Sequence, residues 1–119
     1  MIIVGDIGNT ETKLCLVNSR NIIVKKIILN TKRINSSLLR KSLSSLNLAD
    51  KVIDKCLFCS VVPKSFDKIK NFFNKTYKIK CHELKKLRLS KLIKIKVNYK
   101  QIGSDRLANA IGAINSKDN

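Results

Sequence analysis

A carboxylate, a glycine and two short polar side chains follow the first apolar run of the sequence. The run reads Met-Ile-Ile-Val-Gly, and Asp6, Gly8, Asn9 and Thr10 come soon after it. Glycine lets the backbone approach an anion without a Cβ in the way, and successive amides together with the Asn9 and Thr10 side chains can donate hydrogen bonds to phosphate oxygens. This segment therefore predicts a phosphate-binding turn.

Two charged residues flank this turn. Asp6 would repel a phosphate unless a divalent cation or its bound water lay between them, so we expect Mg²⁺ at Asp6. Lys13, just inside the next expected strand, can reach a phosphate as a point charge. The alternative is an ordinary hairpin turn in which Asp6, Asn9 and Thr10 satisfy local backbone groups.

A second group of reactive side chains stands near the other end of the sequence. Asp105 and Arg106 are adjacent at the expected start of a helix, directly after Gly103 and Ser104. A helix N-terminus favours an ionised carboxylate, and a guanidinium binds an anionic substrate bidentately. Proton transfer comes late in phosphoryl transfer, so Asp105 can accept a hydroxyl proton at an ordinary pKa. The alternative is that Ser104 and Asp105 cap the helix and Arg106 is a surface side chain.

The apolar pattern predicts the elements that position these two segments. Three antiparallel strands come first, with Asp6–Glu11 as the first turn, and later strands alternate with helices. Ser36 or Ser37 would cap the first helix, and Pro63 would end the fourth strand. The expected strands are Met1–Gly5, Thr12–Asn18, Ile22–Leu29, Lys55–Val62, Tyr77–Cys81 and Leu92–Val97, and the expected helices are Ser36–Leu48, Ser65–Phe73 and Ser104–Ile114.

This order of elements predicts a mixed α/β layer fold. It suits a ribonuclease H-like or actin-like ATPase domain, in which a mixed sheet with three antiparallel N-terminal strands carries flanking helices. A doubly wound sheet with an antiparallel edge would give a similar pattern. The length of 119 residues suits one domain. The apolar runs are shorter than the roughly 20 residues that cross a bilayer, and no charged leader precedes them, so we expect a cytoplasmic protein without a membrane segment.

Four cysteines raise the question of a disulfide or a zinc site. Cys56 and Cys59 have the C-x-x-C spacing, but they lie in an expected strand, where side chains three apart point to opposite sides. Cys15 and Cys81 are far from them in sequence. We therefore expect four buried, reduced thiols. His82 is expected to be a surface side chain at a strand end.

The net charge of +17 would suit a protein that binds nucleic acid. The charge is spread along the chain, however, and lysines outnumber arginines four to one. Only four phenylalanines and two tyrosines are available for base stacking. We therefore expect a solvated basic surface and no nucleic-acid partner.

Three motifs in order give the sequence a resemblance to a known family. They are Asp-Ile-Gly-Asn-Thr at residues 6–10, Cys-Ser-Val-Val-Pro at residues 59–63 and Gly-Ser-Asp-Arg at residues 103–106, followed by Asn109. The sequence resembles the type III pantothenate kinases, actin-like-fold enzymes that phosphorylate pantothenate with ATP to 4'-phosphopantothenate in the first step of coenzyme A synthesis. Two small departures are Cys59 and Ser104, which replace a serine and an alanine of the family pattern.

The resemblance implies a role for each motif. Asp105 would be the proton acceptor, and Arg106 would pair with the pantothenate carboxylate. Mg²⁺ would be held through water at Asp6, and a monovalent cation, K⁺ or NH₄⁺, would have its protein ligand outside this chain. The implied ATP phosphate loop comprises Asp6, Ile7, Gly8, Asn9, Thr10, Glu11, Thr12 and Lys13, and the implied pantothenate site comprises Tyr99, Gly103, Ser104, Asp105 and Arg106.

The family has two related domains with ATP between them, and the resemblance places residues 1–119 in the N-terminal one. The second-domain phosphate motif and nucleotide segment do not occur in this sequence. The chain alone is therefore expected to bind ATP weakly and to turn over little, and the full-length protein is expected to be a homodimer. The alternative is a non-catalytic accessory or regulatory module of the same fold whose basic surface binds an anionic partner.

Overall fold

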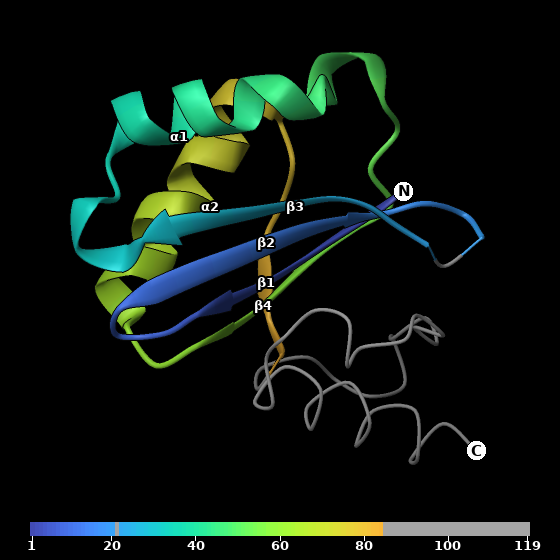
Figure 1. The fold of residues 1–119 in the computed structure, drawn as a ribbon. Coiled ribbons are helices and arrows are strands. Elements are labelled where there is room, and N and C mark those ends of the chain that lie inside the picture. The colour runs from blue at the N-terminus through green and yellow to red at the C-terminus, as the bar shows by residue number, and fades with distance from the viewer. Residues whose placement is uncertain (21, 85–119) are drawn as a thin grey trace, which may run out of the picture.

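A five-stranded mixed sheet forms the centre of the fold. The computed structural model describes residues 1–20 and 22–84. Strands β1 (Ile2–Ile7), β2 (Glu11–Val17) and β3 (Ile23–Asn30) form an antiparallel meander, and β4 (Lys55–Ser60) and β5 (His82–Glu83) run parallel to β1. The strand order is β3-β2-β1-β4-β5 (Figure 1). The predicted mixed α/β fold, with three antiparallel strands at its start, is confirmed.

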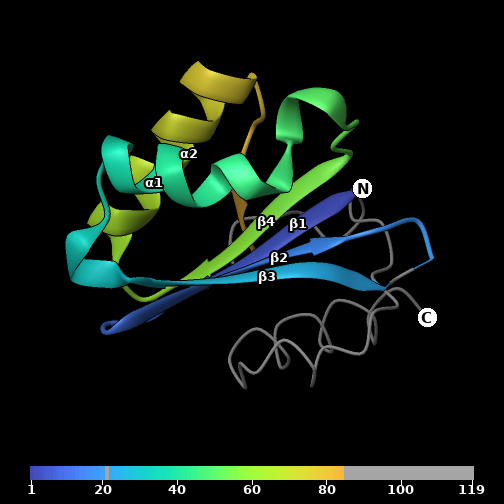
Figure 2. The same cartoon turned by 45° about the horizontal axis from the view of Figure 1, so that its top comes forward.

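Two helices cover one face of this sheet. Helix α1 (Ser36–Leu43) and helix α2 (Pro63–Tyr77) both lie on the same side of the strands in the two ribbon views (Figures 1 and 2). Short 3-10 turns at Thr31–Arg33, Ser44–Leu46 and Leu48–Asp50 lead into and out of α1. The side chains of each strand therefore point alternately toward the two helices and toward the opposite face of the sheet.

Helix α1 begins at Ser36, as the sequence predicted, but its cap and its end differ from the prediction. Its N-cap is Asn35, whose side chain accepts a hydrogen bond from the Leu38 amide at 2.8 Å, so the predicted serine cap was wrong. The helix ends at Leu43 and not at Leu48. Ser44 turns its hydroxyl back to the Lys41 carbonyl at 2.6 Å, and a serine that bonds to the backbone in this way competes with regular helix.

Helix α2 is longer than predicted and replaces a predicted strand. Pro63 both ends the connection from β4 and stands in the first turn of the helix, where its missing amide costs nothing. The ring of Tyr77 lies 5.9 Å from that of Phe73, one turn away, so the helix continues through Tyr77. The left-handed backbone of Lys78 (φ 59) then ends it. The strand predicted at 77–81 was therefore wrong, and β5 begins at His82.

The main core lies between the sheet and the two helices. Phe58 is at its centre, and its ring packs against those of Phe66 and Phe73 from α2. A Cβ at Gly5 would overlap the Phe58 ring, so the glycine on β1 leaves room for this ring on β4. Other members of this core are Ile3, Ile7, Leu14, Leu16, Leu39, Leu43 and Ile69.

The cysteines are buried, as predicted, on both faces of the sheet. Cys56 belongs to the helix-side core, where its Sγ lies 3.1 Å from the Sγ of Cys81. Cys59 is on the opposite face of the same strand, level with Asp6 of β1, so the C-x-x-C pair does not converge. His82 begins β5 and is half-buried, so it is less exposed than the surface side chain that the sequence predicted.

Two predicted elements lie outside the described residues, namely the strand Leu92–Val97 and the helix Ser104–Ile114. None of the helices in the described ranges has the length and apolar character that a bilayer crossing requires.

Candidate phosphate-binding site

The bend between β1 and β2 exposes two backbone amides. The Gly8 amide donates to the Glu11 carbonyl at 2.9 Å and closes the bend around Asn9 and Thr10. Both of these residues are exposed. In the described part of the chain, no backbone carbonyl accepts a hydrogen bond from the Asn9 or Thr10 amide. Two adjacent amides in an exposed bend are a suitable arrangement for an anion such as phosphate.

Two neighbouring segments hold this bend in place. The Thr31 amide, just beyond β3, donates to the Thr10 carbonyl at 2.9 Å, and the Val61 amide, just beyond β4, donates to the Ile7 carbonyl at 3.0 Å. The bend, the end of β3 and the β4–α2 connection therefore gather at one end of the strands, on the left in Figures 1 and 2. The bend is anchored on both sides and is not a free loop.

Asp6 lies in a strand and not in the turn to which the sequence assigned it. Pairing of β1 with both β2 and β4 continues through Ile7, which keeps the backbone extended past Asp6. The Asp6 side chain is 7% exposed and lies on the face of the sheet opposite the helices. Lys13 of β2 is its partner in the antiparallel register, and Cys59 of β4 is its partner in the parallel one.

The side chains of the predicted phosphate loop divide between solvent and core. Those of Glu11, Asn9 and Thr10 are exposed. Ile7 belongs to the helix-side core, and Thr12 is fully buried with its hydroxyl 2.8 Å from the hydroxyl of Thr31. Ile7 and Thr12 can therefore contribute to an anion site through the backbone that they hold in place.

The chemistry of these residues fits Mg²⁺ bound mainly by a nucleotide. Mg²⁺ keeps several waters and is commonly held by one or two carboxylates together with phosphate oxygens. Asp6 offers one carboxylate next to the bend. The described residues contain no group of three or more His, Cys, Asp or Glu side chains that would form a metal site made by protein alone. Asp6 is thus suited to hold Mg²⁺ through water while phosphates supply the other ligands.

The Cys-Ser-Val-Val-Pro segment links the bend to helix α2. The Ser60 hydroxyl oxygen accepts a hydrogen bond from the Val62 amide at 3.0 Å and shapes the turn after β4. In this turn the Val61 amide reaches the Ile7 carbonyl, and Pro63 starts the helix. The segment is therefore a structural support of the bend.

Five of the predicted site residues lie outside the described part of the chain. They are the predicted substrate-binding and catalytic residues Tyr99, Gly103, Ser104, Asp105 and Arg106.

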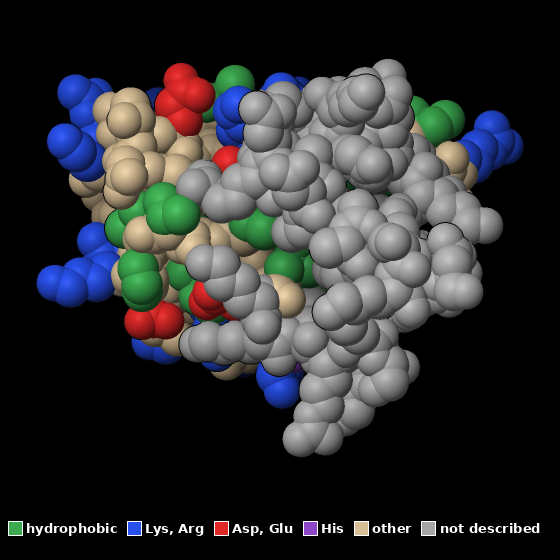
Figure 3. Space-filling model, turned by 90° about the horizontal axis from the view of Figure 1, so that it is seen from below, with side chains coloured by type: hydrophobic (Ala, Val, Ile, Leu, Met, Phe, Trp, Pro, Cys, Tyr) green, Lys and Arg blue, Asp and Glu red, His purple; other side chains and the backbone are tan. Residues whose placement is uncertain are grey.

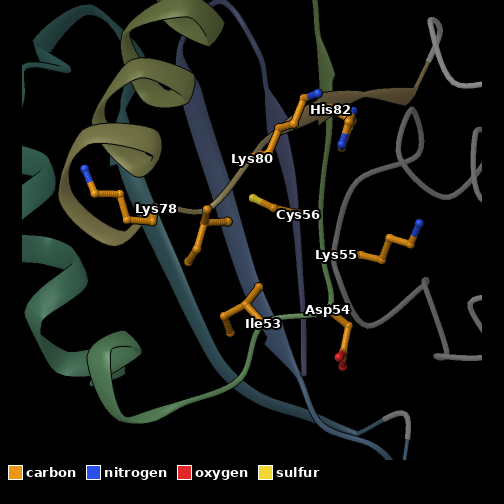
Figure 4. Close-up of a pocket in the computed structure, with 8 residues that line it drawn as sticks. Ile53, Asp54, Lys55, Cys56, Lys78, Lys80 and His82 are labelled. Atoms are coloured by element: carbon orange, nitrogen blue, oxygen red, sulfur yellow. The ribbon is translucent and has the colours of Figure 1, made fainter.

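A second concave site lies at the other end of β4, far from the bend. It is a pocket of about 200 Å³ between the start of β4 and the segment that leads from α2 into β5 (Figure 4). Asp54, which lines it, is paired with the Met1 ammonium at 2.8 Å. No residue of the predicted phosphate loop lines this pocket. Its lining residues are Ile53, Asp54, Lys55, Cys56, Lys78, Ile79, Lys80 and His82.

The charges near this pocket act on His82. Its pKa lies below the ordinary histidine value because burial disfavours the imidazolium, and Lys80, Lys55 and Lys70 add to the effect.

Figure 3 views the molecule from the side opposite the helices. In it, the lysine and arginine side chains that are visible stand at separate places on the described part of this face.

Sequence reasoning missed Thr31. Its two contacts reach residues about 20 positions earlier in the chain, and a lone threonine after a strand carries no local motif. The antiparallel register of β2 and β3 brings it to the bend.

Comparison with known proteins identifies the family. A family model described as type III pantothenate kinase matches residues 2–119. The type III pantothenate kinase of Pelagibacter ubique (strain HTCC1062) is 76% identical over 119 residues, which are 100% of this chain and 48% of that protein. That of Akkermansia muciniphila is 30% identical over 111 residues, 91% of this chain and 41% of that protein. The chain spans about half the length of these curated relatives. By these matches it belongs to the type III pantothenate kinase family.

Proposed function

We propose that this chain forms the N-terminal, phosphate-binding part of a kinase that transfers a phosphoryl group from ATP to the primary hydroxyl of pantothenate, the first step of coenzyme A synthesis. One observation carries the proposal. The β1–β2 bend presents the amides of two exposed residues, Asn9 and Thr10, next to a buried carboxylate, Asp6. The match of the chain to its family supports this reading of the bend.

The bend supplies the grip on the phosphates. The amides of Asn9 and Thr10 would donate to phosphate oxygens. The peptide groups on either side of them are held, because the Ile7 and Thr10 carbonyls accept hydrogen bonds from neighbouring segments. Donors that are fixed before the substrate arrives need little reorganisation when charge moves during transfer. Lys13 would add a positive charge from the strand that follows the bend.

Asp6 would hold Mg²⁺ through a bound water, and the ion would neutralise charge on the phosphates. The carboxylate is kept at this place by strand pairing on both sides. A monovalent cation, K⁺ or NH₄⁺, would complete the nucleotide site with a ligand from outside this chain. Mg²⁺ follows from the chemistry of Asp6 and from the family resemblance, and the monovalent cation follows from the family resemblance alone.

The substrate side of the reaction is assigned to Gly103–Arg106. Asp105 would orient the pantothenate hydroxyl and accept its proton, and Arg106 would pair with the pantothenate carboxylate. Tyr99 would lie against the substrate. We propose in addition that the full-length protein is a cytoplasmic homodimer and that the activity requires the part of the relatives' length that this chain does not span.

The test uses a hybrid protein in which this chain replaces the N-terminal half of the Pelagibacter ubique relative, to which it is 76% identical. The unsubstituted hybrid should form phosphopantothenate from ATP and pantothenate. Asp105→Asn should reduce kcat at least about 100-fold, because the amide cannot accept the hydroxyl proton. Product is measured by mass spectrometry or by coupled release of ADP.

Asp67→Asn is the matched control, because Asp67 is an exposed carboxylate on α2. It should leave turnover within about twofold, as expected of a surface substitution away from the site. An active hybrid with unchanged turnover in Asp105→Asn would refute the role of Asp105. A folded hybrid that makes no phosphopantothenate at all would refute the proposed function.

A further inference from the structure

We propose that Thr31 is a positioning residue for the phosphate-binding bend. It would act on the nucleotide through Thr10 and Thr12 without touching it. The inference rests on the proposed function, because it assigns a residue outside the family motifs to the same site.

Thr31 contacts the bend at two points. Its amide donates to the Thr10 carbonyl at 2.9 Å, and its hydroxyl lies 2.8 Å from the Thr12 hydroxyl. The first contact fixes the peptide group that follows Thr10. The second joins Thr31 to the start of β2. One residue therefore connects the exposed part of the bend with its buried base.

Thr31 is itself held in place. It is 4% exposed and begins the 3-10 turn Thr31–Arg33. Asn30 caps this turn, since its side chain accepts a hydrogen bond from the Lys32 amide at 3.0 Å. Because Thr31 is buried and its turn is capped, its position is fixed relative to the sheet. Its hydrogen bond can therefore fix the position of Thr10 as well.

The contact between the Thr12 and Thr31 hydroxyls depends on the side-chain type at both positions. Both hydroxyl groups are buried, so each depends on the other for a hydrogen bond. Loss of one partner leaves the other unsatisfied, whereas replacement of both by apolar groups of similar shape can be nearly neutral for stability. Stability and positioning can therefore be separated by experiment.

The experiment measures MgATP binding to the hybrid by calorimetry, together with KM and kcat. Thr31→Val keeps the side-chain shape and removes the hydroxyl, and we expect the Kd and KM for MgATP to rise about five- to tenfold with a smaller change in kcat. Thr31→Ser retains the hydroxyl and should restore both values to within about twofold. Thr76→Val, at an exposed position of α2, is the matched control and should change neither.

The double variant Thr12→Val/Thr31→Val separates the two roles. Because it leaves no unpaired hydroxyl, its unfolding free energy should recover toward that of the unsubstituted hybrid, while its Kd for MgATP stays raised. If Thr31→Val does not fold, the Kd of the double variant alone tests the positioning role of Thr31. A Kd that recovers together with stability would show that Thr31 is merely structural and would overturn the inference.

The binding readout keeps this inference apart from the proposed function. A hybrid that binds MgATP but makes no phosphopantothenate would refute the kinase assignment, and the Thr31 variants would still be decided by their Kd values. An active hybrid whose Kd for MgATP is insensitive to Thr31→Val would overturn the role of Thr31 alone. A hybrid that does not bind MgATP would overturn both.

Discussion

Asp6 and Lys13 lie directly opposite each other on the antiparallel strands β1 and β2, on the sheet face away from both helices. The Cβ atoms of such a pair are about 4.5–5.5 Å apart. The side chains of Asp6, whose carboxylate is suited to hold Mg²⁺ through water, and of Lys13, whose ammonium is suited to bind a phosphate, therefore start from neighbouring backbone positions on one face of the sheet. The exposed bend of Asn9 and Thr10 follows within a few residues.

Removal of the Lys13 charge should weaken nucleotide binding. In the hybrid, Lys13→Met should raise the Kd for MgATP about tenfold or more, because a hydrogen bond to a charged group contributes about 1.5–3 kcal/mol. Lys25→Met, at an exposed position of β3, is the control and should change the Kd less than twofold. Equal effects of both substitutions, measured by calorimetry, would mean that only net charge matters.

Gly5 should tolerate no side chain while Phe58 is present. Gly5→Ala places a Cβ against the Phe58 ring and 3.1 Å from the Leu14 side chain, so we expect a loss of about 1–3 kcal/mol in unfolding free energy. Gly5→Ala/Phe58→Leu should be more stable than the sum of the two single effects predicts. Strictly additive values in urea unfolding would contradict this packing.

His82 should titrate below the ordinary histidine value of about 6.5. Burial lowers its pKa first, and Lys80, Lys55 and Lys70 lower it further. A lowered folded-state pKa contributes stability that is present above about pH 6.5 and is lost as the pH falls through the folded value. The protein has one histidine, so a single imidazole signal reports the titration by NMR.

Lys80→Met should move the His82 pKa upward, though not fully to the ordinary value, because burial is the larger cause. Lys68→Met, at an exposed position of α2, is a suitable control. An unchanged midpoint in Lys80→Met would contradict the assigned charge effect.

Cys56 should resist alkylation in the folded protein. Burial raises its pKa well above the ordinary value, and the hydrogen bond with Cys81 raises it further. At pH 8 iodoacetamide should therefore label Cys56 at least about 100-fold more slowly in the native chain than in guanidinium chloride, since the thiolate is the nucleophile. The stability from this shift is present below the unfolded pKa and lost as the pH rises through the folded one. Comparable labelling rates by mass spectrometry would contradict the burial of this thiol.

Much of the fold followed from local patterns in the sequence. The three N-terminal strands have β-branched residues and clear turns between them, and the strand and helix around Pro63 follow from the special backbone of proline. The errors arose where tertiary contacts or side-chain caps set the bounds of a helix. Tyr77 has a strand-like composition around it, but its ring packs on Phe73 and so the helix continues. Asn35 and not Ser36 caps α1, and both are good caps by type.

The sequence predicts residues for the candidate site but not the segments that hold the bend in place. Spacing identified Asn9 and Thr10, because short polar side chains after a strand and a glycine are a local signal. Burial of Asp6 in β1 depends on pairing with β4, which lies more than 50 residues away in sequence. The position of Thr31 at the bend likewise depends on strand register, and a single sequence does not display it.

The crystal structure of the hybrid with a non-hydrolysable ATP analogue, Mg²⁺ and pantothenate tests the central claim most directly. We predict terminal phosphate oxygens within about 3.2 Å of the Asn9 and Thr10 amides, with the pantothenate hydroxyl at Asp105. Phosphates bound at the other end of β4, beside Lys55 and Lys80, with the bend empty, would contradict it.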